Sequence, residues 1–253
     1  MAELSSLVAV SKSYVRGEGR LRVLVDVSLR VDRGEIVAVV GSRDEGKTTL
    51  LKVASGIEEA DQGEVWLGDL DLTRCTDRER SRLLGDEVTW TSREGPGVRL
   101  EVWDYVGLPL VMGRGRGRRE VRGRATQALE RVGVSGCARQ RWEDLSSWER
   151  VLVALARAIV SRPRLMVIDD LLDGLGMRRT QEAGEMLRSL VDELGCGVLM
   201  SASDLETALI AERVWSFSRG RLTLMSDQAR AEANIIDFPS DARQSRDSHG
   251  AGS

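Results

Sequence analysis

The sequence predicts an α/β fold, and three observations support that class. Residues 36–40 form a continuous apolar, β-branched run, which is typical of a strand buried on both faces. The run stops at Gly41, and a helix is expected to start near Gly46. A second buried-strand run, residues 165–168, ends at Asp169 and Asp170. The length of 253 residues and the apolar share of 42% are sufficient for a large aliphatic core.

The remaining elements are expected in the following order. Strands fill residues 1–40, where residues 21–31 alternate between apolar and polar positions. The arginine-rich middle of the chain, residues 77–140, is expected to be helical, with a glycine-rich break at 113–117. Further helices are predicted at 49–54, 146–160 and 180–194, and further strands at 63–67, 197–200, 214–217 and 222–224. The polar tail, residues 226–253, is expected to be disordered.

Composition excludes several classes of chemistry. The only histidine, His249, lies in the polar tail, which argues against Ser-His-Asp triads, Cys-His pairs and multi-histidine zinc sites. Three widely spaced cysteines argue against a disulfide framework. The net charge of −3 argues against a dedicated nucleic-acid binder, and no apolar run approaches the 18 residues of a membrane span.

Residues 41–48 read Gly-Ser-Arg-Asp-Glu-Gly-Lys-Thr and fit the phosphate-loop pattern G-x-x-x-x-G-K-[ST]. The glycines permit a tight turn whose amide N–H groups face phosphate, and the following helix N-terminus favours anions. The alternative is a glycine turn beside a surface lysine, but this chain has only three lysines and keeps one here. The predicted nucleotide-binding residues are Gly41, Ser42, Arg43, Asp44, Glu45, Gly46, Lys47, Thr48 and Thr49.

Asp169 ends a predicted buried strand, and acids at that end of a strand face the ligand crevice of α/β sheets. We expect Thr48 and Asp169 to hold Mg²⁺, the hydroxyl directly and the carboxylate through water. The alternative is an acid that merely ends a strand.

In these motifs the chain resembles the ATP-binding subunits of ABC transporters. The likeness covers residues 4–225 and is strongest over residues 41–49, 145–158 and 162–170. Residues 10–14 and 104–110 look most like the subgroup that serves lipoprotein release and macrolide export. The resemblance implies a P-loop NTPase of ABC type within residues 1–225, with a mixed sheet core, an antiparallel β-layer and a helical subdomain at about 88–161.

The resemblance also implies ATP and Mg²⁺ as cofactors, and membrane permease subunits and a second ATP-binding subunit as partners. Such subunits pair head-to-tail, and each ATP lies between one phosphate loop and the partner's Leu-Ser-Gly-Gly-Gln signature. Tyr14 matches the aromatic residue that stacks on adenine, unless it is only a strand-end tyrosine. Ser146 matches the serine of the signature.

Several positions depart from the family pattern. Ser92 stands at the Q-loop glutamine, Asp170 at the catalytic glutamate, Gly176 at the D-loop aspartate and Ser203 at the switch histidine. Asp170 keeps a carboxylate but retracts it by one methylene, and a misplacement of about 1 Å can cost about 10²-fold in rate. Asp170 is therefore a weakened candidate for the general base.

The signature is altered as well, because Ser147 and Trp148 replace its two glycines. An indole at Trp148 is expected to block the close approach of the helix to phosphate. The alternative is that Ser146 and Glu149 form a capping box, which would leave an ordinary well-capped helix start.

Phosphate- and metal-binding residues are thus retained, while residues that drive hydrolysis are replaced. The expected function is an ATP-binding subunit at the cytoplasmic face of the membrane, acting as the catalytically impaired half of a heterodimeric ATPase. One alternative is an ordinary ATP-hydrolysing subunit that uses Asp170 as base. Another is a soluble non-transport ABC protein. The basic run at residues 113–124 is read either as a solvated loop and helix start or as a contact for lipid headgroups or nucleic acid.

Overall fold

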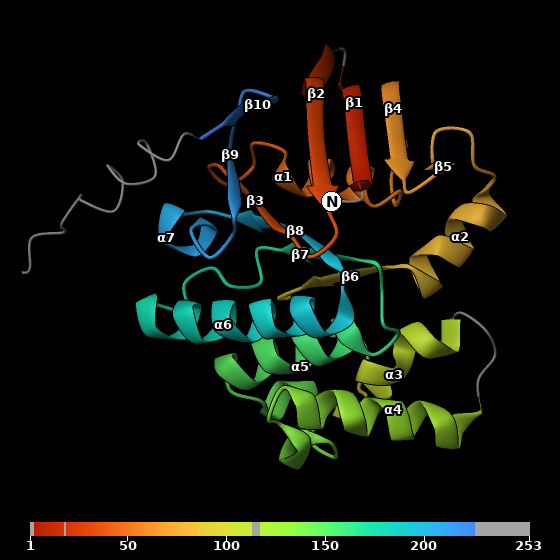
Figure 1. Cartoon of the computed structure of the whole chain (residues 1–253), viewed down its shortest axis with the longest axis vertical. Helices are drawn as coiled ribbons and strands as arrows, with labels where there is room; N and C mark the ends of the chain where they lie inside the picture. The colour runs from red at the N-terminus through yellow and green to blue at the C-terminus, as the bar shows by residue number, and fades with distance from the viewer. Residues whose placement is uncertain (1–2, 18, 113–116, 226–253) are drawn as a thin grey trace, which may run out of the picture.

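The computed structural model describes residues 3–17, 19–112 and 117–225, so the tail predicted at 226–253 lies outside the described residues. Two sheets and a group of helices form layers (Figure 1). The four-stranded antiparallel sheet has the order β2-β1-β4-β5, and the six-stranded sheet has the order β10-β9-β3-β8-β7-β6. The six-stranded sheet is mixed, because only its edge strand β10 runs antiparallel. The predicted mixed sheet and antiparallel layer are therefore confirmed.

The strands of the antiparallel sheet are β1 (Glu3–Arg16), β2 (Gly19–Asp32), β4 (Gln62–Leu67) and β5 (Leu70–Asp71). Those of the mixed sheet are β3 (Ile36–Val40), β6 (Val88–Ser92), β7 (Leu165–Asp169), β8 (Gly197–Ala202), β9 (Arg213–Ser218) and β10 (Arg221–Leu224). The helices are α1 (Lys47–Ala54), α2 (Asp77–Asp86), α3 (Val102–Met112), α4 (Arg118–Arg131), α5 (Ser147–Ile159), α6 (Met177–Leu194) and α7 (Leu205–Ala208). In the described part of the chain, no helix is both long and apolar enough to cross a bilayer.

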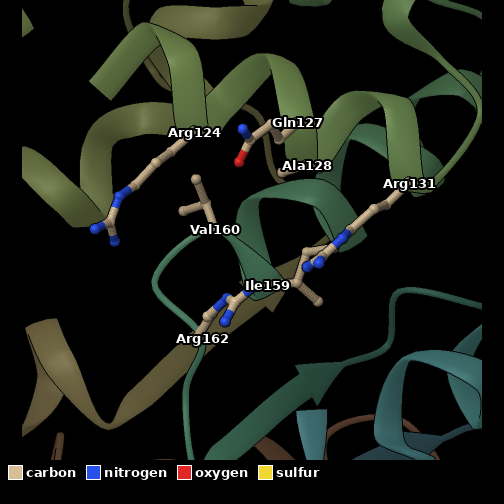
Figure 2. Close-up of a pocket in the computed structure, with 7 residues that line it drawn as sticks. All are labelled: Arg124, Gln127, Ala128, Arg131, Ile159, Val160 and Arg162. Carbon is tan, nitrogen blue, oxygen red and sulfur yellow. The ribbon is translucent and has the colours of Figure 1, made fainter. Parts of the chain in front are cut away.

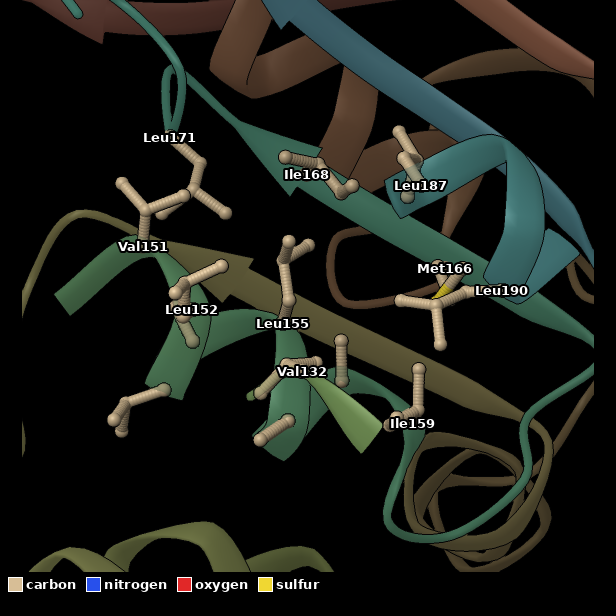
Figure 3. Close-up of a cluster of buried hydrophobic side chains, with 14 of the residues drawn as sticks. Val132, Val151, Leu152, Leu155, Ile159, Met166, Ile168, Leu171, Leu187 and Leu190 are labelled. Atoms are coloured by element: carbon tan, nitrogen blue, oxygen red, sulfur yellow. The ribbon is translucent and has the colours of Figure 1, made fainter. Parts of the chain in front are cut away.

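The mixed sheet separates two hydrophobic cores, which explains the continuous apolar runs of its central strands. In β3, Ile36 and Ala38 face a core built with α3, α4, α5 and α6. The alternate residues Val37 and Val39 face the antiparallel sheet and α1. Figure 3 shows part of the first core, where side chains of α5 and α6 cover Met166 and Ile168 of β7. A strand covered on both faces needs apolar side chains at every position.

Strand β6 corrects the prediction that residues 77–140 are helical. Its five residues pair in parallel with β7, from Val88 opposite Leu165 to Ser92 opposite Asp169. The segment is short, and its Thr and Ser residues hide the apolar run that identified β3 and β7. The first five residues of the predicted helical subdomain, 88–92, therefore belong to the mixed sheet. The helices of that region are α3, α4 and α5, and its division from the rest stays a prediction.

Candidate functional site

The phosphate-loop residues connect β3 to α1 and depend on both glycines. A Cβ on Gly46 would lie 2.3 Å from Val23 Cγ1, and Gly46 has a φ of 108°, which side chains rarely adopt. A Cβ on Gly41 would lie 2.5 Å from the carbonyl oxygen of Phe217 in β9. Asp44 also has a positive φ, of 63°, which aspartate tolerates better than most residues. Only glycine fits at the two ends of this loop.

Lys47 is almost fully buried, at 4% exposure, although it carries an ammonium group. Its Nζ donates to the carbonyl oxygens of Gly41 at 2.7 Å and Ser42 at 3.0 Å, so the side chain connects the end of the loop to its beginning. The residue before α1 is Gly46, which offers the first turn of the helix no side-chain cap. Uncapped N–H groups at a helix N-terminus, beside a buried cation, are the arrangement that binds phosphate.

Glu45 braces the same loop from one side. Its Oε2 accepts the N–H of Ser42 at 3.0 Å and lies 3.0 Å from the position that a Cβ on Gly41 would occupy, next to Phe217. The side chains of Arg43 and Asp44 are exposed. Glu45 is a predicted nucleotide-binding residue because it lies in the phosphate loop. Its carboxylate accepts a hydrogen bond from within that loop.

Thr48 and Asp169, the predicted metal-binding pair, lie together. Thr48 Oγ1 donates to Asp169 Oδ2 at 2.9 Å and so links α1 to the end of β7. Burial raises the pKa of Asp169 above its usual value, and the neighbouring Asp170 raises it further, while hydrogen bonds from Ser201 and Thr48 oppose both effects. A buried carboxylate in this condition gains from a nearby cation.

This donor set fits Mg²⁺ that is shared with phosphate. One hydroxyl and one carboxylate are the oxygen ligands that Mg²⁺ takes when phosphate and water complete its shell. In residues 3–17, 19–112 and 117–225 no group of three or more His, Cys, Asp or Glu side chains could hold a metal ion.

Asp170, the predicted base, is held by Ser201 at the end of β8. Ser201 Oγ accepts the Asp170 N–H at 2.8 Å and lies 2.7 Å from Asp170 Oδ1 and 2.8 Å from Asp169 Oδ1. Ser201 is 1% exposed, and Asp170 has a φ of 47°. Sequence reasoning did not single out Ser201. The available signal was a polar residue that immediately follows the apolar strand run 197–200.

The loops after β6, β7 and β8 are tied together at Asp173, which is 3% exposed. The Ser203 N–H donates to Asp173 Oδ1 at 3.2 Å, and the Arg93 guanidinium donates to the Asp173 carbonyl oxygen. Ser92 is the register partner of Asp169, so it lies at the same edge of the sheet. Three of the positions that depart from the family pattern, Ser92, Asp170 and Ser203, are thus brought to one edge.

Tyr14 lies on β1 beside the first turn of α1. Its hydroxyl donates to Glu58 Oε1 at 2.5 Å and lies 3.3 Å from Thr49 Oγ1. Partial burial and the Glu58 carboxylate raise the pKa of Tyr14. The tyrosine is 37% exposed and therefore accessible next to the phosphate loop. Its stacking on adenine stays a prediction.

Ser146 is the N-cap residue of α5. Its Oγ accepts the Glu149 N–H at 3.3 Å, and Glu149 Oε2 accepts the Ser146 N–H at 2.8 Å, so the predicted capping box is present. Among the described residues no hydrogen bond or ion pair joins Ser146 to the phosphate loop. The Arg179 guanidinium of α6 lies over the indole of Trp148, 4.6 Å from the ring centre. That the indole blocks phosphate stays a prediction.

Comparisons with known proteins agree with this geometry. A family model described as ABC transporter matches residues 24–172. The lipoprotein-releasing system ATP-binding protein LolD of Colwellia psychrerythraea is 29% identical over 230 residues, which is 90% of this chain and 89% of LolD. The macrolide export ATP-binding/permease protein MacB of Rhodopirellula baltica is 30% identical over 91% of this chain, but the chain spans only 34% of MacB.

Among solved structures, the dimeric structure of MJ0796, a bacterial ABC transporter cassette, matches with a TM-score of 0.78. The match has 25% identity and covers 87% of this chain and 96% of that cassette. The matched family region runs from β2 to just beyond β7 and so includes the phosphate loop, Asp169 and Asp170.

Proposed function

The chain belongs to the ABC transporter family, and from that premise we propose that it is the ATP-binding subunit of a membrane transport system. The observation that carries the proposal is the joint placement of Lys47, Thr48 and Asp169 around an uncapped helix N-terminus. Two relatives that match about nine-tenths of this chain are named as ATP-binding proteins, which supports the same ligand.

The chain's own residues divide the work of binding. The N–H groups of the first turn of α1 would donate to phosphate oxygens. Lys47 would donate to a phosphate oxygen in place of one of its two carbonyl partners. Thr48 and Asp169 would hold Mg²⁺, which, when bound, neutralises phosphate charge. The accessible ring of Tyr14 would receive the adenine. None of these roles requires a histidine.

We further propose that hydrolysis by this chain is slow. Asp170 is one methylene shorter than glutamate, and its backbone N–H and carboxylate are both engaged by Ser201. Ser92 and Ser203 are too short to reach where glutamine and histidine would reach. A chain that binds but hydrolyses poorly would act best beside a better-equipped second subunit, so we propose a heterodimer at the cytoplasmic face of the membrane, coupled to permease subunits.

Nucleotide binding is tested by titrating the protein with ATP and Mg²⁺. Lys47→Ala should weaken binding by about 30-fold or more, because it removes a buried charged partner of the phosphates. Lys52→Ala is the matched control, since Lys52 lies on the same helix α1 and is expected to leave affinity unchanged. Equal affinity in wild type and Lys47→Ala would refute the proposed site.

Impaired hydrolysis is tested by single-turnover measurement on the purified chain, alone and with its partner subunit. We expect turnover far below that of an ordinary cassette. Hydrolysis at ordinary rates that Asp170→Asn abolishes would instead establish the second candidate, a working ATPase that uses Asp170 as base. The observation in favour of that candidate is that Asp170 keeps a carboxylate beside Asp169.

A further inference from the structure

A small basic hollow lies between α4 and the end of α5, and we propose that it binds a phosphate group. We call it the arginine pocket. Its volume is about 260 Å³. Its lining residues are Arg124, Gln127, Ala128, Arg131, Ile159, Val160 and Arg162 (Figure 2). Arg124, the last residue of the basic run at residues 113–124, is one of them.

The arginine pocket is built on a packed apolar base. Its four α4 residues, at positions 124, 127, 128 and 131, share one face of that helix because they are spaced by three and four residues. Ala128, Ile159 and Val160 are each at most 5% exposed and form the base. Figure 2 shows Arg131 and Arg162 extending toward each other, with Arg124 on the other side of Val160. The polar groups therefore stand at the rim, where a ligand can reach them.

The charges of the arginine pocket are incompletely compensated. Three arginine residues line it, and no acidic residue does. Arg124 pairs with Glu120 at 3.1 Å and Arg131 with Glu193 at 2.6 Å, whereas Arg162 pairs with no carboxylate in the part of the chain that the structure describes. Each guanidinium has five N–H donors, and one carboxylate occupies at most two. Free donors on three like charges are best satisfied by an anion with several oxygens.

Size and shape favour a single phosphate group. A hollow of about 260 Å³ admits one phosphate and a small attached group, and guanidinium groups bind phosphate through paired hydrogen bonds. The Gln127 amide adds a neutral donor. An extended nucleic-acid strand would need a basic groove rather than one hollow, and the net charge of −3 does not favour it.

The arginine pocket is separate from the phosphate loop. Arg162 precedes the amino end of β7, which begins at Leu165, whereas Asp169 is at the carboxyl end of the same strand. The two sites therefore lie at opposite ends of the parallel strands of the mixed sheet. The phosphate group could belong to a soluble compound or to a lipid headgroup, and both share the recognised chemistry.

The test measures binding of inorganic pyrophosphate by calorimetry to the full chain carrying Lys47→Ala, so that the phosphate loop contributes little. We expect binding to persist in that background and to weaken at least tenfold when Arg131→Gln or Arg162→Gln is added. Arg119→Gln is the matched control, because Arg119 lies on α4 but does not line the pocket. It should change affinity less than twofold. Circular dichroism verifies that each variant is folded.

A second arm measures co-sedimentation of the same variants with phosphatidylglycerol vesicles and with vesicles of phosphatidylcholine alone. Loss of phosphatidylglycerol binding in Arg131→Gln and Arg162→Gln, but not Arg119→Gln, identifies a lipid headgroup. Pyrophosphate binding without vesicle binding identifies a soluble phosphate compound. The proposal is overturned if neither probe binds, or if Arg119→Gln weakens binding as much as the pocket variants do. Because Lys47 is already removed, failure here leaves the proposed nucleotide site untouched.

Discussion

Ser201 is joined to Asp170 twice through one oxygen: Ser201 Oγ accepts the Asp170 N–H at 2.8 Å and lies 2.7 Å from Asp170 Oδ1. The same oxygen lies 2.8 Å from Asp169 Oδ1. A hydroxyl has one hydrogen, so it can donate to only one of the two carboxylates at a time. If a ligand engages Asp169, the Ser201 hydrogen is left to donate to Asp170. Ser201 would then hold the carboxylate of the proposed base more firmly.

We predict that Ser201→Ala increases single-turnover ATP hydrolysis by up to about tenfold. A catalytic group that is misplaced by about 1 Å can lose about 10²-fold in rate, and removal of the hydroxyl frees the Asp170 carboxylate to move. Ser203→Ala is the matched control, since the Ser203 hydroxyl has no hydrogen-bond partner in the described residues. It should leave the rate unchanged. A slower Ser201→Ala variant would mean that Ser201 positions Asp170 productively.

The pH dependence of stability should reveal the buried charge of Asp169. Its pKa is raised in the folded chain, chiefly by burial. Below the ordinary value of 3.8 both states are protonated and nothing is lost; as the pH rises through the raised folded pKa, the folded state loses stability relative to the unfolded state. Asp169→Asn should therefore raise the melting temperature of the metal-free chain at pH 7.

The gain from Asp169→Asn should shrink as the pH falls toward 4, because Asp169 is then increasingly protonated in the wild type. Thermal unfolding at both pH values, without nucleotide and with a chelator, measures the difference. Added Mg²⁺ and ATP should reverse the ranking at pH 7, since only the wild type keeps the carboxylate. A gain that is equal at both pH values would show that the carboxylate charge is not responsible.

Sequence reasoning located the nucleotide-binding elements because their physics is local. A phosphate loop must follow a buried strand and precede a helix, and both neighbours have strong composition signals at residues 36–40 and 47–54. The same holds for the capping box at Ser146 and Glu149, whose spacing alone specifies the contact. Thr48 and Asp169 were each predicted to hold Mg²⁺, Thr48 from the phosphate-loop pattern and Asp169 from its place at the end of a buried strand. The structure joins the two side chains by a hydrogen bond.

Long-range contacts were harder to predict. Strand β6 is stabilised by pairing with β7, and the partners Val88 and Leu165 are 77 residues apart in the sequence. The five residues of β6 include Thr and Ser and carry little apolar signal. Ser201 contacts Asp170 across the β7–β8 pair, and the polar residue after the run 197–200 does not by itself name Asp170 as its partner. The contact between the Trp148 ring and Arg179 joins α5 to α6, and no local pattern around residue 148 encodes it.

The glycine at position 46 should be the least replaceable residue of the phosphate loop. Gly46→Ala combines a positive φ with a Cβ 2.3 Å from Val23. We therefore expect the free energy of unfolding to fall by about 2–5 kcal/mol, and nucleotide binding to weaken. Gly34→Ala is the control, because Gly34 has a φ of 74° but no atom within 4 Å of the added Cβ. It should cost about 1–2 kcal/mol in urea unfolding. Equal losses would show that crowding at Val23 contributes nothing.

The stack between Trp148 and Arg179 should contribute measurable coupling between α5 and α6. A double-mutant cycle of Trp148→Ala and Arg179→Ala is expected to give a coupling free energy of about 0.5–1 kcal/mol in urea unfolding. Arg179 also pairs with Glu182, but the cycle cancels that contribution. The control cycle pairs Trp148→Ala with Arg178→Ala, because Arg178 pairs with the same Glu182, whereas the cation–π contact with the indole is made by Arg179. Its two changes should be additive. Coupling of the same size in both cycles would mean that the charge of this segment, rather than the stacked geometry, holds the indole against α6.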